Sequence, residues 1–393
     1  MTEIFLAAPV RTPIGRFGGG LAPLTAAELG AAAARETIRR AGVEPEAIGQ
    51  TVFGNARQAG GGPNPARQTG RRAGLPDASP AFTINMACAS GLQAILCAAQ
   101  VVREGDADIV LAGGMESMSR VPYYLERARW GYRLGGAEIV DGMYRDGFLC
   151  PLSERIMGDT AETLAELHSI PREEQDGFAV ESQRRCMEAR RAGRFRDEIV
   201  AVEVPSGKGA PSRIEFDEHP RDGVTLEALA SLPAVFRKNG TVHAGNSSGI
   251  TDGAASLLVL SAEAARRTGV EPWARIVAHA TAGVDPAVMG IGPVPAVRKL
   301  EARAGVRLEE IDLVELNEAF AAQVLACDRI LRFDRSRLNV NGGSIALGHP
   351  IGATGVRIVV TLLHEMRRRA ARTGLATLCV SGGMGFALLL ERI

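Results

Sequence analysis

The sequence predicts an α/β fold made of two similar halves with an insertion between them. Three observations lead to this prediction. Short apolar runs bounded by Gly and Asn alternate with helical stretches along the 393 residues. Two helical segments, residues 92–102 and 356–363, are apolar almost all round. The same order of sequence landmarks surrounds both segments, which is typical of an internal duplication.

The apolar runs are the expected strands, and the two apolar segments are the expected central helices. The strands are predicted at residues 4–8, 51–53, 81–84, 109–112, 256–260 and 275–278. A helix without a polar face must be covered on every side. We therefore expect the two apolar helices to pack together between sheets.

The duplication is visible in the residues that flank the two helices. The first is preceded by TIN and CASG and followed by GDADIVLAGGM, which ends at Met115. The second is preceded by NVN and a Gly-rich loop and followed by GLATLCVSGGM, which ends at Met384. The repeated order of strand, turn, buried helix and strand predicts two halves related by pseudo-symmetry.

An insertion separates the two halves. Charge-rich helices such as residues 172–192 and Pro- and Gly-rich connections such as residues 205–211 change the pattern there. Active sites of layered α/β folds lie where loops converge at strand ends, so the insertion is well placed to supply a substrate pocket. The predicted division is residues 1–118 with 250–269 as the N-terminal half, 119–249 as the inserted loop domain, and 270–393 as the C-terminal half.

Composition and charge exclude several classes of protein. With 45 basic and 45 acidic residues the net charge is zero, which argues against a nucleic-acid binder with a broad basic face. No run of about 18 apolar residues and no leader pattern occurs, so we expect a cytoplasmic protein without a membrane partner. The six cysteines form no CxxC pair and none lies near a His at ligand spacing, which argues against a zinc site and a disulfide framework.

Two residues at the start of the predicted central helices are candidates for chemistry. Cys88 follows an apolar strand, and the positive end of a helix dipole is expected to lower the pKa of its thiol and make it a nucleophile. The alternative is a small core cysteine, as expected for Cys97. His349, in the loop NVNGGSIALGHPIGATG, occupies the mirror position and is the candidate general base. A structural histidine is the alternative.

Two further residues follow predicted strands of the second half. Cys379 ends the last strand before a Gly-dense turn whose free amides would suit an oxyanion hole. It serves either as an acid/base for a carbon acid or as an ordinary strand residue. Asn317 follows the apolar run 313–316 and either holds a water or carbonyl oxygen or caps a helix.

Four segments in order resemble the catalytic segments of the thiolases. They are CAS from Cys88, NEAF from Asn317, GHP ending at Pro350 and CVSGGMG from Cys379. The match continues through VRTPIG, NPARQ, GGMESMS, AGNSSGITDGAA and MGIGPVPA. The resemblance implies a five-layered αβαβα sandwich of two duplicated halves with an inserted loop domain. It also implies that acyl-CoA and coenzyme A are substrates, with neither a cofactor nor a metal.

The resemblance also implies residue roles. Cys88 takes the acyl group as a thioester after activation by His349, and Cys379 moves the proton at the α-carbon in Claisen condensation. One oxyanion hole uses His349 and a water held by Asn317, and the other uses the backbone amides of Cys88 and Ser381. Residues expected along coenzyme A are Met157, Arg221, Thr225, Ala244, Ser248, Met289, Ala319 and Phe320.

Two departures from the family pattern bear on the expected function. Ser381 stands where a glycine is common, which stores strain if that position needs a positive φ. Ile156 replaces a His of some biosynthetic members and puts acetoacetyl specificity in doubt.

The expected function is that of an acetyl-CoA C-acetyltransferase, and a longer-chain 3-ketoacyl-CoA thiolase is the alternative. A non-catalytic acyl-CoA-binding protein would be expected to have lost one of Cys88, His349 or Cys379. A decarboxylating ketosynthase would have a second His in place of Asn317. Relatives with an insertion like residues 123–147 pair dimers into tetramers, so a homotetramer is expected.

Overall fold

The two halves each contribute one part of a long mixed sheet. The computed structural model describes residues 3–206 and 209–393. The first part contains, in spatial order, β1 (Ile4–Arg11), β12 (Thr251–Ser261), β5 (Ile109–Ser117), β3 (Gln50–Gly54) and β4 (Ala81–Ile84). The second contains β13 (Ala274–Gly283), β16 (Met384–Arg392), β15 (Thr373–Val380) and β14 (Leu313–Leu316). The parts join where β1 pairs briefly with β13, and all six strands expected from apolar runs are present.

The two parts of the sheet have the same topology, which confirms the duplicated architecture. In the first, β3 is parallel to β4 and β5, and β5 is antiparallel to β12, which pairs with β1. In the second, β14 is parallel to β15, and β15 is antiparallel to β16, which pairs with β13. A parallel bridge between Val314 and Leu338 takes the place of β4. The residue boundaries of the halves stay a prediction.

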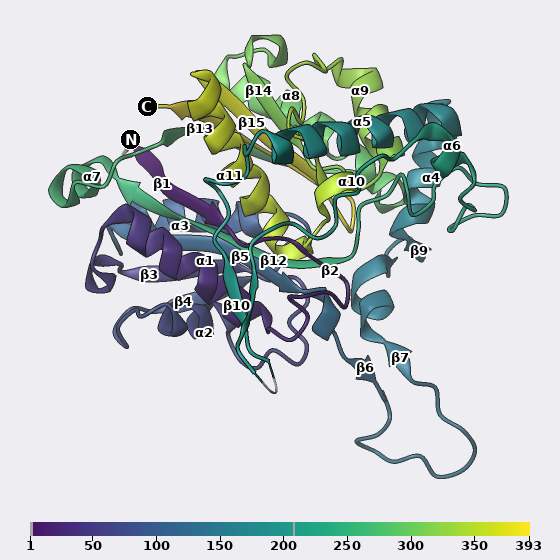
Figure 1. Ribbon diagram of the computed structural model, residues 1–393, viewed down its shortest axis with the longest axis horizontal. Helices are drawn as coiled ribbons and strands as arrows, with labels where there is room; N and C mark the ends of the chain where they lie inside the picture. The colour runs from purple at the N-terminus through teal and green to yellow at the C-terminus, as the bar shows by residue number, and fades with distance from the viewer. Residues whose placement is uncertain (1–2, 207–208) are drawn as a thin grey trace.

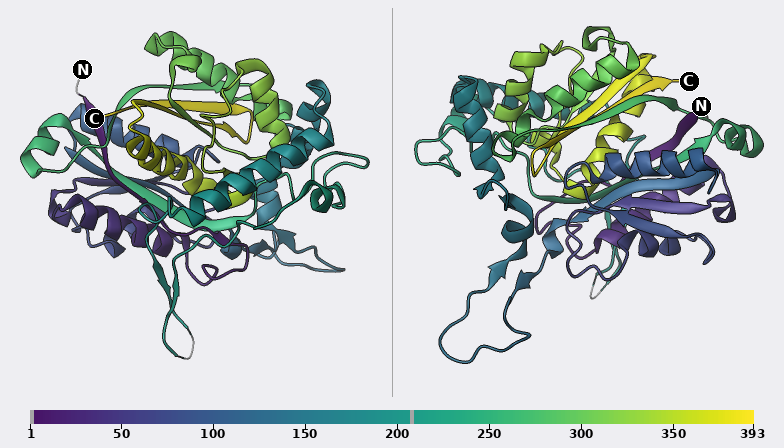
Figure 2. Two further views of the ribbon diagram at one scale, coloured as in Figure 1. Left: turned by 45° about the horizontal axis from the view of Figure 1, so that its top comes forward. Right: turned by 180° about the vertical axis from the view of Figure 1, so that it is seen from behind.

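The predicted central helices lie between the two parts of the sheet and pack on each other (Figure 2). They are α3 (Ser90–Glu104) and α11 (Ile351–Arg369). A Cβ on Gly91 would lie 2.7 Å from the Val356 backbone N, and one on Gly355 would lie 2.4 Å from the Leu92 backbone N. Glycine at these two positions therefore lets the helix backbones touch.

Further helices cover the outer faces and complete the five layers. On the first half these are α1 (Ala26–Ala41) and α2 (Pro65–Arg72), and on the second half α8 (Pro293–Ala304) and α9 (Ala321–Leu331). The halves also contain β2 (Gly15–Arg16), α7 (Ala262–Thr268), α10 (Ser344–Leu347) and the short helices η1 (Pro45–Ala47), η4 (Pro286–Ile291) and η5 (Leu308–Glu310). Across the two described ranges, no helix is long and apolar enough to cross a membrane.

The insertion lies mainly against the second half. Its helices are α4 (Met157–Leu167), α5 (Arg172–Arg191) and α6 (Leu226–Ala230), and α4 and α5 pack against α9. Figure 1 shows two extensions that project from the body: an arm between β6 (Tyr123–Tyr124) and β7 (Val140–Asp141), and the hairpin of β10 (Val202–Val204) and β11 (Ser212–Ile214). The π-helical turn η3 (Tyr144–Phe148), β8 (Leu149–Cys150) and β9 (Arg155–Ile156) lead from the arm to α4.

Candidate active site

The structure brings Cys88 and His349 into contact. Each lies two residues before the first residue of a central helix, and the His349 Nε2 atom is 3.3 Å from the Cys88 Sγ atom. The His349 Nδ1 atom is 2.6 Å from the Thr354 hydroxyl oxygen, and that hydroxyl donates to the Pro350 carbonyl oxygen at 3.0 Å. Because the hydroxyl proton is used there, Nδ1 carries the imidazole hydrogen. The lone pair on Nε2 therefore faces the thiol.

Both members of this pair are neutral at rest. Burial, helped by the nearby positive charges of Arg357 and Arg57, lowers the pKa of His349 to about 3. Burial also raises the pKa of the Cys88 thiol. The lowered thiol pKa expected from a helix dipole is therefore wrong, because desolvation outweighs the neighbouring amides. Proton transfer must then accompany the attack of Cys88 on a substrate rather than precede it.

Two backbone amides approach the thiol of Cys88. The N–H groups of Ser381 and of Cys88 itself favour the thiolate and partly offset the effect of burial on the pKa of Cys88. The positive φ angles of the turn fall on Gly382 and Gly383, at 90° and 86°, and not on Ser381. The serine therefore adopts an ordinary backbone conformation, and the strain considered from sequence does not arise.

Cys379 lies in the same cavity as Cys88, one residue before the end of β15. Its side chain is buried, and burial together with the neighbouring Cys88 raises the pKa of the Cys379 thiol well above its usual value. The thiol therefore holds its proton at neutral pH, as a proton donor to carbon must.

Asn317 does not cap a helix, because α9 begins four residues later with Phe320 at its N-cap. Its Oδ1 atom accepts a hydrogen bond from the Ser344 hydroxyl at 2.6 Å, while the Arg357 Nη2 atom donates to that hydroxyl at 2.9 Å. The buried Nδ2 atom of Asn317 has no partner among the described residues. Since buried donors are normally satisfied, this amide fits the predicted water site.

Cys88, His349, Cys379 and Ser381 line a cavity of about 360 Å³, a size typical of ligand pockets. Other residues predicted along coenzyme A also line it: Met157, Arg221, Ala244, Ser248, Met289, Ala319 and Phe320. Thr225 does not, because its hydroxyl accepts from the Ala228 N–H at 3.2 Å and caps α6. Within the described ranges, no cluster of three His, Cys, Asp or Glu side chains is arranged to hold a metal.

Sequence reasoning missed several residues of the cavity wall. Arg57 comes directly after the turn that ends β3, and Tyr144 and Phe148 belong to η3 of the insertion. The Nδ1 atom of His219 lies 2.8 Å from the Ala346 carbonyl oxygen. The ring of Phe236 packs edge-on against Phe320. The position of Arg57 after a strand was the one available signal, because the others come from irregular segments.

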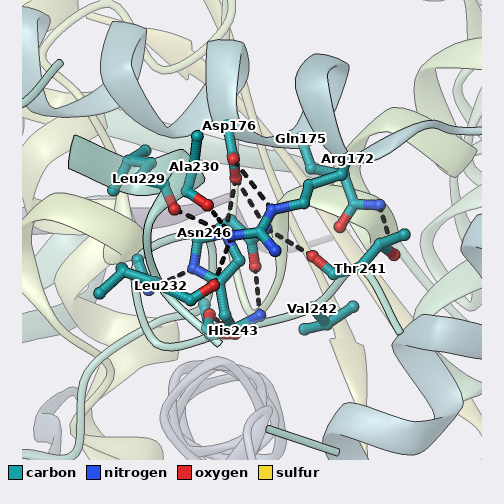
Figure 3. Close-up of polar contacts among 12 residues, drawn as sticks. Arg172, Gln175, Asp176, Leu229, Ala230, Leu232, Thr241, Val242, His243 and Asn246 are labelled. Carbon is teal, nitrogen blue, oxygen red and sulfur yellow. Dashed lines mark hydrogen bonds and ion pairs between the residues drawn. The ribbon is translucent and has the colours of Figure 1, made fainter. Parts of the chain in front are cut away.

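A buried polar network holds the loop that carries Ala244 and Ser248 (Figure 3). The carboxylate of Asp176 on α5 accepts from the His243 Nε2 atom at 2.7 Å and from the Asn246 Nδ2 atom at 3.0 Å. Arg172 lies one turn earlier on α5 and donates to the carbonyl oxygens of Leu229 and Ala230 at the end of α6 and of Leu232 after it. The insertion thereby fixes one wall of the cavity.

Two family models together match nearly the whole chain. The model described as "Thiolase, N-terminal domain" matches residues 4–263, and "Thiolase, C-terminal domain" matches residues 270–392. The chain belongs to the thiolase family. This thiolase is 51% identical over 392 residues to an acetyl-CoA acetyltransferase of Pseudomonas aeruginosa, and the match covers 100% of both chains.

Solved structures agree with the assignment. The Bacillus anthracis acetyl-CoA acetyltransferase superposes on this thiolase with a TM-score of 0.98 at 44% identity, covering 100% of this chain and 99% of that one. The human mitochondrial 3-ketoacyl-CoA thiolase superposes with a TM-score of 0.95 at 42% identity and the same coverage. Both comparisons support the five-layered thiolase fold.

Proposed function

We propose that this thiolase is an acetyl-CoA C-acetyltransferase that forms or cleaves acetoacetyl-CoA through an acyl group on Cys88. The observation that carries the proposal is the 3.3 Å contact between the Cys88 Sγ atom and the His349 Nε2 atom, in a cavity that Cys379 also lines. Transfer of an acyl group between carbon and sulfur requires a nucleophile, its base and a second proton donor. The acetyl-CoA acetyltransferase of Pseudomonas aeruginosa supports the assignment.

In cleavage, Cys88 bonds to the 3-oxo carbon while its proton passes to the lone pair of His349 Nε2. The bond between the second and third carbons then breaks, and the Cys379 thiol protonates the departing acetyl-CoA enolate. Coenzyme A next attacks the acyl group on Cys88 and gives its proton to the Cys379 thiolate, and His349 returns its proton to Cys88. The negative oxygens are held by the amides of Cys88 and Ser381, and by His349 with a water on Asn317.

Variants of the two cysteines test these roles. Cys88→Ala should abolish turnover and stop labelling of the protein by radiolabelled acetyl-CoA. Cys379→Ser should keep that labelling but lose condensation almost entirely. A labelled Cys88→Ala protein would exclude Cys88 as the nucleophile. Equal loss of both half-reactions in Cys379→Ser would exclude the proton-transfer role.

A longer-chain 3-ketoacyl-CoA thiolase is the second candidate, favoured by the similarity to the human mitochondrial 3-ketoacyl-CoA thiolase. Ile156, an apolar residue of the cavity wall, is compatible with either substrate. A thiolysis assay over 3-ketoacyl-CoA chains from four to sixteen carbons separates them. Among these methyl-ended chains, a maximum at four carbons supports the first candidate, and a maximum at longer chains supports the second. A binding protein without catalysis would turn over none of them.

The same proposal extends to a cytoplasmic homotetramer. The arm between β6 and β7 exposes several apolar side chains, including Trp130 and Leu134, at 84% and 96% exposure. Exposed apolar groups of this kind are typical of protein contacts. Light scattering should give a tetramer for the native chain and a dimer for Trp130→Ser with Leu134→Ser. An unchanged mass in the double variant would exclude the arm.

A further inference from the structure

Two arginines of the cavity wall, Arg57 and Arg221, form no ion pair among the described residues, and of the two only Arg57 is half-buried. Arg57 is half-buried and lines the cavity beside Cys88, yet none of its guanidinium nitrogens lies within 4.0 Å of a carboxylate among the described residues. Its Nε atom is buried without any hydrogen-bond partner, and its Nη1 atom has one weak contact, 3.5 Å from the Ala56 carbonyl oxygen. A guanidinium so placed leaves most of its five donors unused.

The acidic groups around Arg57 are committed to other donors. The Glu116 carboxylate accepts from the Asn55 Nδ2 atom and from the backbone N–H groups of Ala56, Arg57 and Gly352, at 2.6 to 3.1 Å. The Asp146 carboxylate accepts from the Tyr124 hydroxyl at 2.6 Å. Neither carboxylate forms an ion pair with the guanidinium. Its positive charge does lower the pKa of the buried Glu116, against the larger effect of burial, but its hydrogen-bond donors remain available to the cavity.

The guanidinium is held in place by packing. A Cβ on Gly147 would lie 2.9 to 3.2 Å from the Nε, Nη2 and Cζ atoms of Arg57, so the planar group rests against the bare backbone of η3. Any larger residue at position 147 would push the guanidinium away. The site is therefore shaped around an arginine side chain.

Arg57 lies on the side of Cys88 where the acyl group is expected. Cys88 packs against an apolar cluster that includes Met143, Phe148 and Ile351. The residues expected along the pantetheine arm, such as Met289, belong to a different cluster, which also contains Cys379. A group bonded to Cys88 and directed away from coenzyme A would therefore extend toward Phe148 and Arg57.

We propose that this thiolase transfers acyl groups that end in a carboxylate, which Arg57 binds. The inference rests on the proposed function and names a substrate class for the same site: short 3-oxoacyl-CoA thioesters of dicarboxylic acids. Cleavage of the six-carbon member leaves a four-carbon acyl group on Cys88 with a terminal carboxylate, releases acetyl-CoA, and uses the proton transfers already described. A guanidinium binds a carboxylate through two parallel hydrogen bonds.

The same residue disfavours apolar chains of equal length. A methyl-terminated acyl group would displace water from the guanidinium and supply no acceptor, which is costly for a charged group. Hydrogen bonds to charged groups contribute about ten-fold to a hundred-fold each in affinity. The structure therefore predicts at least about a ten-fold preference for the carboxylate-ended substrate.

The experiment compares thiolysis of two six-carbon substrates, 3-oxoadipyl-CoA and 3-oxohexanoyl-CoA, and measures the ratio of their kcat/KM values. The native enzyme should favour 3-oxoadipyl-CoA at least about ten-fold. Arg57→Leu should bring the ratio to one or below, and Arg57→Lys should restore part of it. The control is Arg145→Leu, because Arg145 lies in η3, against which the Arg57 guanidinium packs, but is outside the cavity wall and pairs with Glu126. It should leave the ratio unchanged.

The outcomes distinguish this inference from the proposed function. A native enzyme that cleaves acetoacetyl-CoA but shows no preference for 3-oxoadipyl-CoA over 3-oxohexanoyl-CoA, or cleaves neither of these two, overturns the inference alone. A preference that survives in Arg57→Leu also overturns it, because another group would then bind the carboxylate. No thiolysis of any of the three substrates overturns the proposed function itself.

Discussion

The buried imidazole of His349 predicts a specific dependence of stability on pH. The folded protein holds the pKa of this group at about 3, against an ordinary value of 6.5. Between these two values the unfolded chain binds a proton that the folded protein excludes, so the free energy of unfolding rises with pH in this window. Stability is therefore fully present above about pH 6.5 and is lost progressively as the pH falls toward 3.

The size of the effect follows from the same two pKa values. Lowering the pH from 7 to 5 shifts the protonation of the unfolded histidine by about one and a half pH units, at about 1.4 kcal/mol per unit. The native protein should thus lose about 2 kcal/mol more of its unfolding free energy than His349→Asn, which has no titrating group there. Urea unfolding at both pH values and one protein concentration measures the difference.

A second variant isolates the imidazole from its partner. Cys88→Ser keeps His349 in its buried position, so it should retain the full pH dependence of the native protein. If His349→Asn and the native protein lost equal free energy between pH 7 and pH 5, the pKa of His349 would be the same in the folded and unfolded states. The lowered pKa inferred from burial would then be wrong. A native protein that lost less free energy than His349→Asn would instead show a charged His349 beside a Cys88 thiolate.

Three further predictions concern the framework of the site. Asp176→Ala should cost about 3–5 kcal/mol of unfolding free energy, because it leaves buried donors unpaired beside the cavity. It should also raise the KM for coenzyme A, and an unchanged KM would show that the polar network does not affect coenzyme A binding. Gly91→Ala should lower the unfolding free energy by at least about 1–3 kcal/mol, because the new methyl group clashes with Val356. The control is Gly177→Ala on α5, whose methyl group would meet nothing within 4 Å and should not destabilise the protein. Equal melting temperatures of the two variants would contradict this packing. Ser381→Gly should lower stability by up to about 1 kcal/mol in calorimetry, and a gain would reveal strain at the serine.

Most of the fold could be predicted from local sequence patterns because its buried elements are almost uniformly apolar. The two central helices could be recognised for this reason. The repeat of Gly-Gly-Met was a weaker guide, because the two copies do not have the same structure. In the first half the strand continues through Gly113 and Gly114 to Ser117, because both glycines pair with β12. In the second half Gly382 and Gly383 have positive φ and end β15. The same Gly-Gly-Met sequence adopts different structures in the two halves, because strand pairing and turn geometry depend on the surrounding chain.

The positions of the site residues could be predicted where sequence motifs contain them. The properties that depend on burial could not. Cys88, His349, Cys379 and Ser381 come together as the motifs indicated. The direction of the Cys88 pKa shift could not be predicted, because desolvation depends on residues far away in the sequence. Arg57 was missed for a similar reason, since its lack of a partner is a property of the folded cavity.

The duplication itself explains why the nucleophile and the base meet. Each precedes its helix by two residues, in corresponding positions of the two halves. The first turns of α3 and α11 touch because Gly91 and Gly355 have no side chains, and the two helix N-termini therefore converge. Residues at these two positions therefore lie close together, and here they are the thiol of Cys88 and the imidazole of His349. The chemistry thus depends on the glycines of the helix contact as directly as on Cys88 and His349.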